Sequence, residues 1–451
     1  MAPISNQWFC FNFRERIVEM PDISTGAQVF DISFHPTASL VYVGLLTGGI
    51  KAFSYDEQGQ AEEKFSIRPS KRSCRGLATN EDGSHLFAVG KGKAMYTIDT
   101  STGKVIDTRT GIHQSPINRI KCLTPHLLCT GDDDGVVKVR EFTVHSCLLR
   151  FLFDVHVFGG TQLWDPRNPG EIKSYDHHFD FISDFMWTGD RKQLVTTSGD
   201  GTLSVIDVRS KKPGPLTQSE DQEDELLSIA RIRGGEKTVV GTQQGILSIF
   251  NRSSGWGDCV DRVPGHPHSI DALHPLPSSY PSSHSTLLTG SSDGFLRAVQ
   301  LFPTKLLGIV ADHGEFPIER IAIDWNGEGH WVGSVGHDEV LKLTDLREIF
   351  EDEDDHEEDD KGDEEDSDEG RKGNGDVSAS GALAGAIDSD EDKAGHQVEP
   401  GADDSDSDSE PQKKKRRKKT KVQDPLEAAR KKKRKARNDE VSADPSFFAD
   451  L

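Results

Sequence analysis

Four groups of side chains are of types that support catalysis or ligand binding in other proteins. Gly90-Lys-Gly-Lys93 contains the residues of a phosphate-binding loop but lacks the GxxxxGK[ST] spacing. Asp132-Asp-Asp134 lacks the alternating ligands and the distal glutamate of a calcium loop. His177-His178 and His266-Pro-His268 have no further ligands at the spacing of a metal site. Because a GxSxG nucleophile motif is also missing, we interpret the chain as a non-enzyme without metal or cofactor, in which Asp134 and these histidines stabilise turns.

Two basic runs near the C-terminus are the strongest functional signal. Residues 411–440 carry 15 basic and four acidic side chains. The runs consist of Lys413, Lys414, Lys415, Arg416, Arg417, Lys418 and Lys419, then Arg430, Lys431, Lys432, Lys433, Arg434 and Lys435. Such runs are typical of nuclear and nucleolar localisation signals, and they can neutralise RNA phosphates. Aromatic residues do not interrupt them, so we expect an RNA contact without base stacking.

The segment before these runs is strongly acidic. Residues 351–410 carry 26 acidic and four basic side chains, and we assign 349–410 as an acidic linker. Because like charges repel, the acidic linker, the basic segment 411–440 and the end at 441–451 are predicted to be disordered. Ser389, Ser405 and Ser407 each precede an acid by three residues, so they are candidate sites for an acidophilic kinase. The alternative is that they are polar spacers.

These segments explain the composition of the chain. Its 451 residues include 53 Lys+Arg and 76 Asp+Glu, a net charge of −23, and only 34% are hydrophobic. Residues 1–350, with 44 acids and 34 bases, can build a core, whereas residues 351–451 cannot. Apolar runs fall short of the ~18–20 residues of a membrane span, and the N-terminal lead 1–13 does not resemble a secretory signal. We therefore expect neither a membrane nor a small-molecule partner, and we read the six scattered cysteines as reduced thiols.

A unit of short apolar runs and Gly-flanked tight turns occurs seven times in residues 14–348. The turns are Gly44–Gly48, Gly90–Gly92, Gly131–Gly135, Gly199–Gly201, Gly241–Gly245, Gly290–Gly294 and Gly336–Glu339. The strands predicted after them are Ile50–Tyr55, Ala94–Asp99, Val136–Val139, Leu203–Asp207, Ile246–Phe250, Leu296–Leu301 and Val340–Asp345. A spacing of about 49 residues favours an all-β, seven-bladed β-propeller. The last unit lacks an outer strand, which Arg14–Met20 is predicted to supply.

The repeats resemble WD repeats, with Gly131-Asp-Asp-Asp-Gly-Val-Val-Lys-Val139 as a strong instance. Ser198–Val205, the acidic-then-basic tail and the terminal Phe447-Phe-Ala-Asp-Leu451 extend this to a resemblance to the WD repeat-containing protein 55 family. The resemblance implies a seven-bladed WD-repeat propeller with a role in pre-rRNA processing and large-subunit maturation. Most third strands lack the tryptophan of typical WD repeats and carry Phe53, Ile98, Ile206 or Phe250. We therefore expect apolar packing to hold most blades together.

One stretch interrupts the repeat pattern. Residues 140–162 separate Val139 from Leu163-Trp164-Asp165, and joining the two would restore a regular third strand. We interpret 140–162 as a translated intron or other gene-model artefact, with a genuine blade insertion as the alternative. The nearby tetrad Trp164-Asp165-Pro166-Arg167 resembles the WDxR box by which some propellers dock onto cullin–RING ubiquitin ligases, with Arg167 as the docking residue. Asp207 and Arg209 form a partial copy of it. Alternatively, Asp-x-Arg is an ordinary way for a blade strand to end.

Three functions from different classes are compatible with this sequence. The first is a non-catalytic scaffold in the nucleus and nucleolus that binds pre-ribosomal assembly factors through its propeller faces. The second is a ubiquitin-ligase substrate receptor that uses Arg167 and Arg209. The third is a chaperone for histones or ribosomal proteins whose working part is the acidic segment. We favour the scaffold because the charge-divided tail suits an RNA-rich nuclear compartment.

Overall fold

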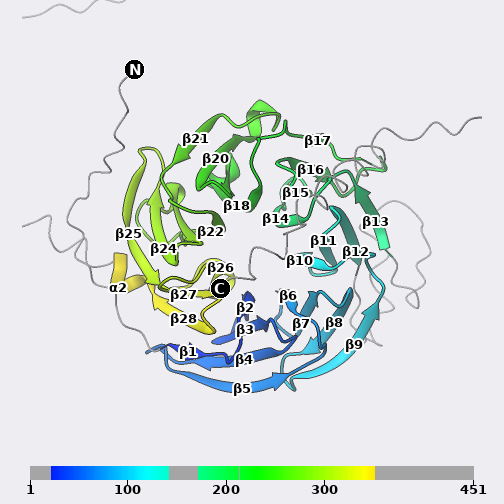
Figure 1. Cartoon of the computed structure of the whole chain (residues 1–451), viewed down its shortest axis with the longest axis vertical. Helices are drawn as coiled ribbons and strands as arrows, with labels where there is room; N and C mark the ends of the chain where they lie inside the picture. Colours follow the sequence, from blue (N-terminus) through cyan, green and yellow to red (C-terminus); the bar gives the residue numbers. More distant parts are fainter. Residues whose placement is uncertain (1–21, 142–170, 213, 351–451) are drawn as a thin grey trace, which may run out of the picture.

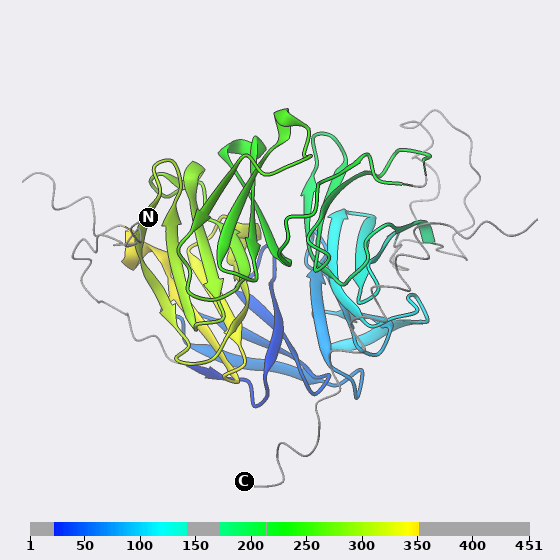
Figure 2. The ribbon, with the colours of Figure 1, turned by 45° about the horizontal axis from the view of Figure 1, so that its top comes forward.

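Seven four-stranded antiparallel sheets are arranged radially around a central axis (Figure 1). The structure is a computed structural model that describes residues 22–141, 171–212 and 214–350. The first strand of each sheet lies beside the axis and the fourth lies at the rim (Figure 1). In the tilted view the strands of each blade run from one face of the ring to the other (Figure 2). The predicted seven-bladed propeller is confirmed.

Blades 1 to 6 each use four consecutive strands of the chain. Blade 1 contains β2 (Val29–Phe34), β3 (Leu40–Leu45), β4 (Ile50–Tyr55) and β5 (Ala61–Ile67). Blade 2 contains β6 (Cys74–Thr79), β7 (His85–Gly90), β8 (Ala94–Asp99) and β9 (Lys104–Thr110). Blade 3 contains β10 (Ile117–Thr124), β11 (Leu127–Asp132), β12 (Val136–Glu141) and β13 (Glu171–Asp176).

The second half of the ring repeats this order. Blade 4 contains β14 (Ile182–Thr188), β15 (Gln193–Ser198), β16 (Leu203–Asp207) and β17 (Thr217–Gln218). Blade 5 contains β18 (Leu226–Ile232), β19 (Lys237–Thr242), β20 (Ile246–Asn251) and β21 (Asp261–Pro264). Blade 6 contains β22 (Ile270–Pro275), β23 (Thr286–Ser291), β24 (Phe295–Gln300) and β25 (Lys305–Asp312).

The two ends of the propeller meet in blade 7, which closes the ring. It contains β26 (Ile318–Ile323), β27 (Trp331–Gly336) and β28 (Val340–Asp345), and β1 (Ile23–Ser24) pairs with β28 as the fourth strand. The N-terminal part of the chain therefore supplies the outer strand, as predicted, but the strand is Ile23–Ser24. The stretch Arg14–Met20 lies outside the described residues.

Helices are few and short. The α-helices are α1 (Asp324–Gly327) and α2 (Leu346–Phe350), and the 3-10 turns are η1 (Arg233–Gly235), η2 (Arg252–Ser254) and η3 (Ser283–Ser285). In the part of the chain that the structure describes, no helix combines the length and the hydropathy needed to cross a bilayer.

The hydrophobic core is a ring of seven clusters, each between two neighbouring blades. For example, Val137 and Tyr175 of blade 3 pack with Phe185 and Leu194 of blade 4. The third-strand residues that replace tryptophan are almost fully buried, with 4% exposure at Phe53 and 0% at Ile206. Apolar packing between blades thus holds the ring together, as the sequence predicts.

The tight turns join the second and third strands and share one backbone feature. The third residue after each second strand has a left-handed conformation, with φ between 77° and 86° where it is glycine, as at Gly135 and Gly245. Lys93 and Glu339 take this position in blades 2 and 7 with φ of 60°. A side chain there costs about 1 kcal/mol, which explains why glycine is commoner.

The first glycine of several predicted turns lies in the second strand instead. A Cβ atom on Gly131 would come within 2.6 Å of the side chain of Ile182 in the next blade. Gly290 is in similar contact with Ile318, at 2.8 Å. These glycines therefore let adjacent blades pack closely, which is a role that the sequence pattern did not indicate.

Blade 3 contains the start of the suspected insertion. Arg140 and Glu141, its first two residues, complete β12, and Arg140 is buried with its Nη2 donating to the carbonyl of Ile112 at 3.0 Å. The fourth strand of this blade begins at Glu171. Residues 142–162 lie outside the described residues, so their origin stays a prediction.

Candidate functional site

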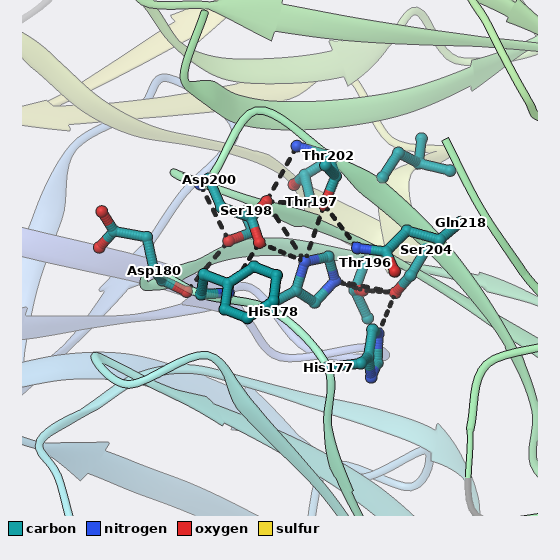
Figure 3. A network of polar contacts seen from close by, with 12 residues as sticks. His177, His178, Asp180, Thr196, Thr197, Ser198, Asp200, Thr202, Ser204 and Gln218 are labelled. Carbon is teal, nitrogen blue, oxygen red and sulfur yellow. Dashed lines mark hydrogen bonds and ion pairs between the residues drawn. The ribbon is translucent and has the colours of Figure 1, made fainter. Parts of the chain in front are cut away.

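The histidines that precede blades are buried partners of the tight turns. His178 is fully buried, its Nδ1 lies 3.1 Å from Asp200 Oδ2, and its Nε2 lies 3.0 Å from Thr196 Oγ1 (Figure 3). Burial raises the pKa of Asp200, but the His178 hydrogen bond and the donors from Thr202 and Phe179 outweigh it and lower the pKa overall. The turn carboxylate is thus held ionised between two blade strands.

The same arrangement occurs in two other blades. His113 contacts Asp132 at 2.9 Å and Thr130 at 2.7 Å. His313 contacts Asp338 and Ser334, at 2.5 and 2.8 Å. In blade 6, His266 reaches Thr289 at 2.8 Å. The prediction that the histidines before the blades stabilise turns is therefore confirmed for His178, whereas the side chain of His266 contacts Thr289 in the strand β23.

The Asp132-Asp-Asp134 triplet divides its roles in a different way from the prediction. Asp132, not Asp134, closes the turn: its Oδ1 accepts from the backbone N–H of Asp134 and Val136 at 3.0 and 2.8 Å. Asp133 pairs with Arg75 at 3.1 Å. Asp132 ends β11 and is buried, so His113 meets this carboxylate. In blades 4 and 7, by contrast, the histidine meets the aspartate two residues after the second strand, Asp200 or Asp338.

A ring of bulged residues forms the most distinctive cavity of the propeller. The pairing register breaks at the second residue of every first strand. These seven residues all line one cavity of about 320 Å³: Phe30, Arg75, Asn118, Ser183, Leu227, Asp271 and Glu319. Because a bulge redirects a side chain out of the regular alternation, each blade contributes one side chain to this cavity, which we call the channel mouth.

The channel mouth opens on the face of the ring that carries the tight turns, since Asp133 and Phe181 also line it. Its charges are unevenly distributed. Arg75 of blade 2 donates to Asn118 Oδ1 at 2.6 Å and pairs with Asp133. Blades 6 and 7 contribute Asp271 and Glu319. Arg119 of blade 3 also lines the mouth, so two bases accompany the single acid Asp133 on this side, whereas blades 6 and 7 contribute acids.

The carboxylates of blades 6 and 7 have perturbed environments. Burial raises the pKa of Asp271 to about 6, although Ser269 Oγ donates to it at 2.8 Å. Glu319 lies 2.7 Å from His337 and raises the pKa of this imidazole.

Below the mouth, charged side chains connect blades across the channel. Arg320 of blade 7 lies 3.4 Å from Asp184 of blade 4 and donates to the carbonyl of Ser183 at 3.1 Å. Arg119 of blade 3 donates to the same carbonyl at 2.6 Å. Burial raises the pKa of Asp184, while Arg119 opposes this. The contacts fix the shape of the mouth from beneath.

The residues proposed for ligase docking fall into two groups. Trp164, Asp165 and Arg167 lie outside the described residues. Arg209 is 62% exposed at its side chain, yet its guanidinium binds Asp207 at 3.0 Å and the carbonyl of Arg191 at 2.9 Å. Arg209 thus contacts its own turn and the neighbouring one, and ligase docking through Asp207 and Arg209 stays a prediction.

The other predicted functional residues, Ser389, Ser405, Ser407 and the two basic runs, lie outside the described residues and stay predictions. In the described ranges, no three metal-ligating side chains form a group.

Comparison with known proteins identifies the family. A family model described as WDR55 matches residues 20–349, which are most of the chain and the whole propeller. The chain belongs to the WDR55 family. Members of other lineages support this assignment. WD repeat-containing protein JIP5 of Laccaria bicolor is 57% identical over 353 residues, covering 75% of this chain and 78% of the relative.

More distant WDR55 relatives cover the same region. WD repeat-containing protein 55 of Rattus norvegicus is 31% identical over 336 residues, covering 74% of this chain and 78% of its own length. The Arabidopsis thaliana protein of that name is 32% identical over 334 residues, with 73% and 84% covered. The family resemblance inferred from the repeats is thereby confirmed, and with it a WD-repeat scaffold.

Sequence reasoning missed the channel mouth of this WDR55 protein. Its seven side chains share no residue type, so they form no motif. The signal that exists is positional: each follows the first residue of an innermost strand, such as Ile182 before Ser183 and Ile318 before Glu319. The arrangement suits non-covalent recognition of a protruding protein segment that carries charges of both signs.

Proposed function

We propose that this WDR55 protein is a non-catalytic scaffold of the nucleus and nucleolus that acts in ribosome biogenesis, in pre-rRNA processing and large-subunit maturation. The observation that carries the proposal is the charge-divided tail, with 26 acids in residues 351–410 and 15 bases in 411–440, attached to a WDR55 propeller. A basic segment supports residence among RNA, and an acidic one supports contact with basic ribosomal proteins.

The channel mouth supplies the binding site for a protein partner in this proposal. A partner segment that carries a base would meet Asp271 and Glu319, and one that carries an acid would meet Arg75. Because these groups come from separate blades on a rigid ring, they are already in place before the partner arrives. Such preorganisation lowers the entropy cost of binding.

A purification from nuclear extract tests the proposed function. The tagged full-length chain is isolated at moderate salt, with and without RNase, and the eluate is analysed by protein identification and pre-rRNA hybridisation. We expect assembly factors and large-subunit precursors. A stoichiometric ligase adaptor without pre-rRNA would overturn the proposal and favour docking through Arg167 and Arg209.

A variant of the channel mouth tests whether this cavity binds the protein partners. Asp271→Asn with Glu319→Gln removes both carboxylates while keeping their shape and volume. The control, Asp261→Asn with Asp312→Asn, changes the same charge near the rim on β21 and β25. Protein partners should be lost only from the mouth variant; equal recovery from both variants would show that the mouth is not the binding site.

Nuclear import is tested separately by microscopy. Serine substitution of Lys413–Lys419 and Arg430–Lys435 should move a fluorescent fusion from the nucleolus to the cytoplasm. An unchanged nucleolar signal would contradict the localisation that we propose.

A further inference from the structure

The face opposite the channel mouth carries a cluster of basic side chains on blades 4 and 5. β14 and β16 both start at the mouth face, so the turns that follow Thr188 and Asp207 lie on the opposite face. These turns and η2 of blade 5 carry six bases, which we call the basic ridge: Arg191, Lys192, Arg209, Lys211, Lys212 and Arg252.

Side-chain contacts join the parts of the basic ridge into one surface. The guanidinium of Arg209 donates to the carbonyl of Arg191 at 2.9 Å, which brings the two turns of blade 4 together. Arg252 of blade 5 pairs with Asp190 of blade 4 at 2.9 Å. On the other side, Lys173 of blade 3 donates to the carbonyl of Val208 at 2.8 Å. The basic ridge is thus one continuous surface on blades 4 and 5, and it is also in contact with blade 3.

The ridge has an excess of positive charge. Its two acids are already neutralised, Asp190 by Arg252 and Asp207 by Arg209. Arg191, Lys192, Lys211 and Lys212 are exposed and make no ion pair with the described residues. Residues 1–350 carry ten more acids than bases, so this excess is contrary to the charge of the propeller as a whole.

This charge pattern favours a phosphodiester backbone as the partner. Exposed lysines on convex turns act as point charges, and phosphates are bound by such charges without an apolar pocket. A protein partner would instead need buried aromatic or aliphatic anchors. We propose that the basic ridge binds the backbone of single-stranded RNA. This surface is separate from the basic tail, and the proposal holds whether or not the protein acts in ribosome biogenesis.

The test compares two triple variants of the full-length chain that lose equal charge. The ridge variant is Lys192→Gln, Lys211→Gln, Lys212→Gln. The control is Lys71→Gln, Arg72→Gln, Lys91→Gln, whose three exposed bases lie on the mouth face of blade 2. The basic tail is intact in both. Since all six side chains are exposed, both variants should have the urea midpoint of the wild type.

The measurement is the salt dependence of binding to a labelled oligouridine of about 30 nucleotides. A single-strand contact contributes about 0.7 to the slope of log affinity against log salt, so three contacts contribute about 2. Between about 50 and 200 mM salt, the wild type and the control should therefore lose about 20-fold more affinity than the ridge variant. Ultraviolet crosslinking should place RNA on the peptides that contain Lys192 and Lys211.

Two results would overturn the proposal. The first is an equal slope for both variants with crosslinks confined to residues 411–440. The second is an equal slope together with carboxylate–lysine crosslinks between Lys211 and residues 351–410, which would make the chain's own acidic segment the occupant of the ridge. That segment follows α2, whose Phe350 packs on Tyr280 of blade 6 with ring centroids 5.5 Å apart.

Discussion

Replacing Asp200 by alanine should destabilise the propeller more than any substitution of an exposed turn aspartate. The carboxylate accepts hydrogen bonds from the backbone N–H of Phe179 and Thr202, at 2.8 and 2.9 Å, and from Thr202 Oγ1 at 2.7 Å. It also faces His178, whose side chain has 0% exposure (Figure 3). Alanine removes all of these acceptors at once.

The magnitude follows from the donors left behind. A buried donor without a partner costs about 1–3 kcal/mol, and water can reach the half-buried Phe179 and Thr202 but not His178. We therefore expect the free energy of unfolding to fall by about 1–3 kcal/mol. The control is Asp82→Ala, since Asp82 accepts from the backbone N–H and the hydroxyl of Ser84 in an exposed turn, where the loss should stay below about 1 kcal/mol.

Urea unfolding followed by tryptophan fluorescence gives both values. The pKa of Asp200 is lowered in the folded protein, so its contribution is complete above the unfolded pKa near 4 and is lost as the pH falls through the folded value. The difference between wild type and Asp200→Ala should therefore shrink below about pH 4. A loss no larger than that of Asp82→Ala would refute the reasoning that the turn carboxylate anchors the blade.

Three further perturbations test other parts of the ring. Burial raises the pKa of Asp271 to about 6, so the wild type loses stability as the pH rises from the unfolded pKa near 4 through this value. Asp271→Asn does not titrate. Between pH 4 and 7 the free energy of unfolding of the wild type should therefore fall relative to that of the variant by at most about 3 kcal/mol. Gly131→Ala places a Cβ 2.6 Å from the next blade and should cost about 1–3 kcal/mol in urea, whereas Gly257→Ala, with no atom within 4 Å, should cost under about 0.5. Deleting residues 1–24 removes Ile23–Ser24 and should lower the unfolding temperature and cause association in light scattering, while deleting 1–20 should not.

The fold could be predicted because the strand and turn signals are local. Glycines such as Gly135 and Gly294 mark a left-handed turn position, and the predicted strands Ile50–Tyr55 and Val340–Asp345 agree with the structure residue for residue. The role of Gly131 could not be predicted, since it depends on the approach of Ile182 from another blade. Contacts between blades leave no local pattern.

The candidate site was predictable only in part, for the same reason. His178 stands directly before its blade at the position of a WD-repeat histidine, so its turn contact follows from the repeat. The channel mouth instead combines single residues about 50 positions apart, such as Asp271 and Glu319, and only the closed ring brings them together. Identification of the bulge at the second residue of each first strand requires the pairing register.

The closing pair between β1 and β28 has a consequence for synthesis on the ribosome. Ile23–Ser24 leave the exit tunnel among the first propeller residues, but their partners Val340 and Leu341 are among the last propeller residues to be translated. Until then, β2 of blade 1 cannot pack against β26 and β27, so Val29 and Ile32 of its core cluster stay uncovered. A nascent propeller of this kind exposes two apolar flanks until blade 7 has been synthesised, and such transiently exposed apolar surface favours aggregation unless a chaperone covers it.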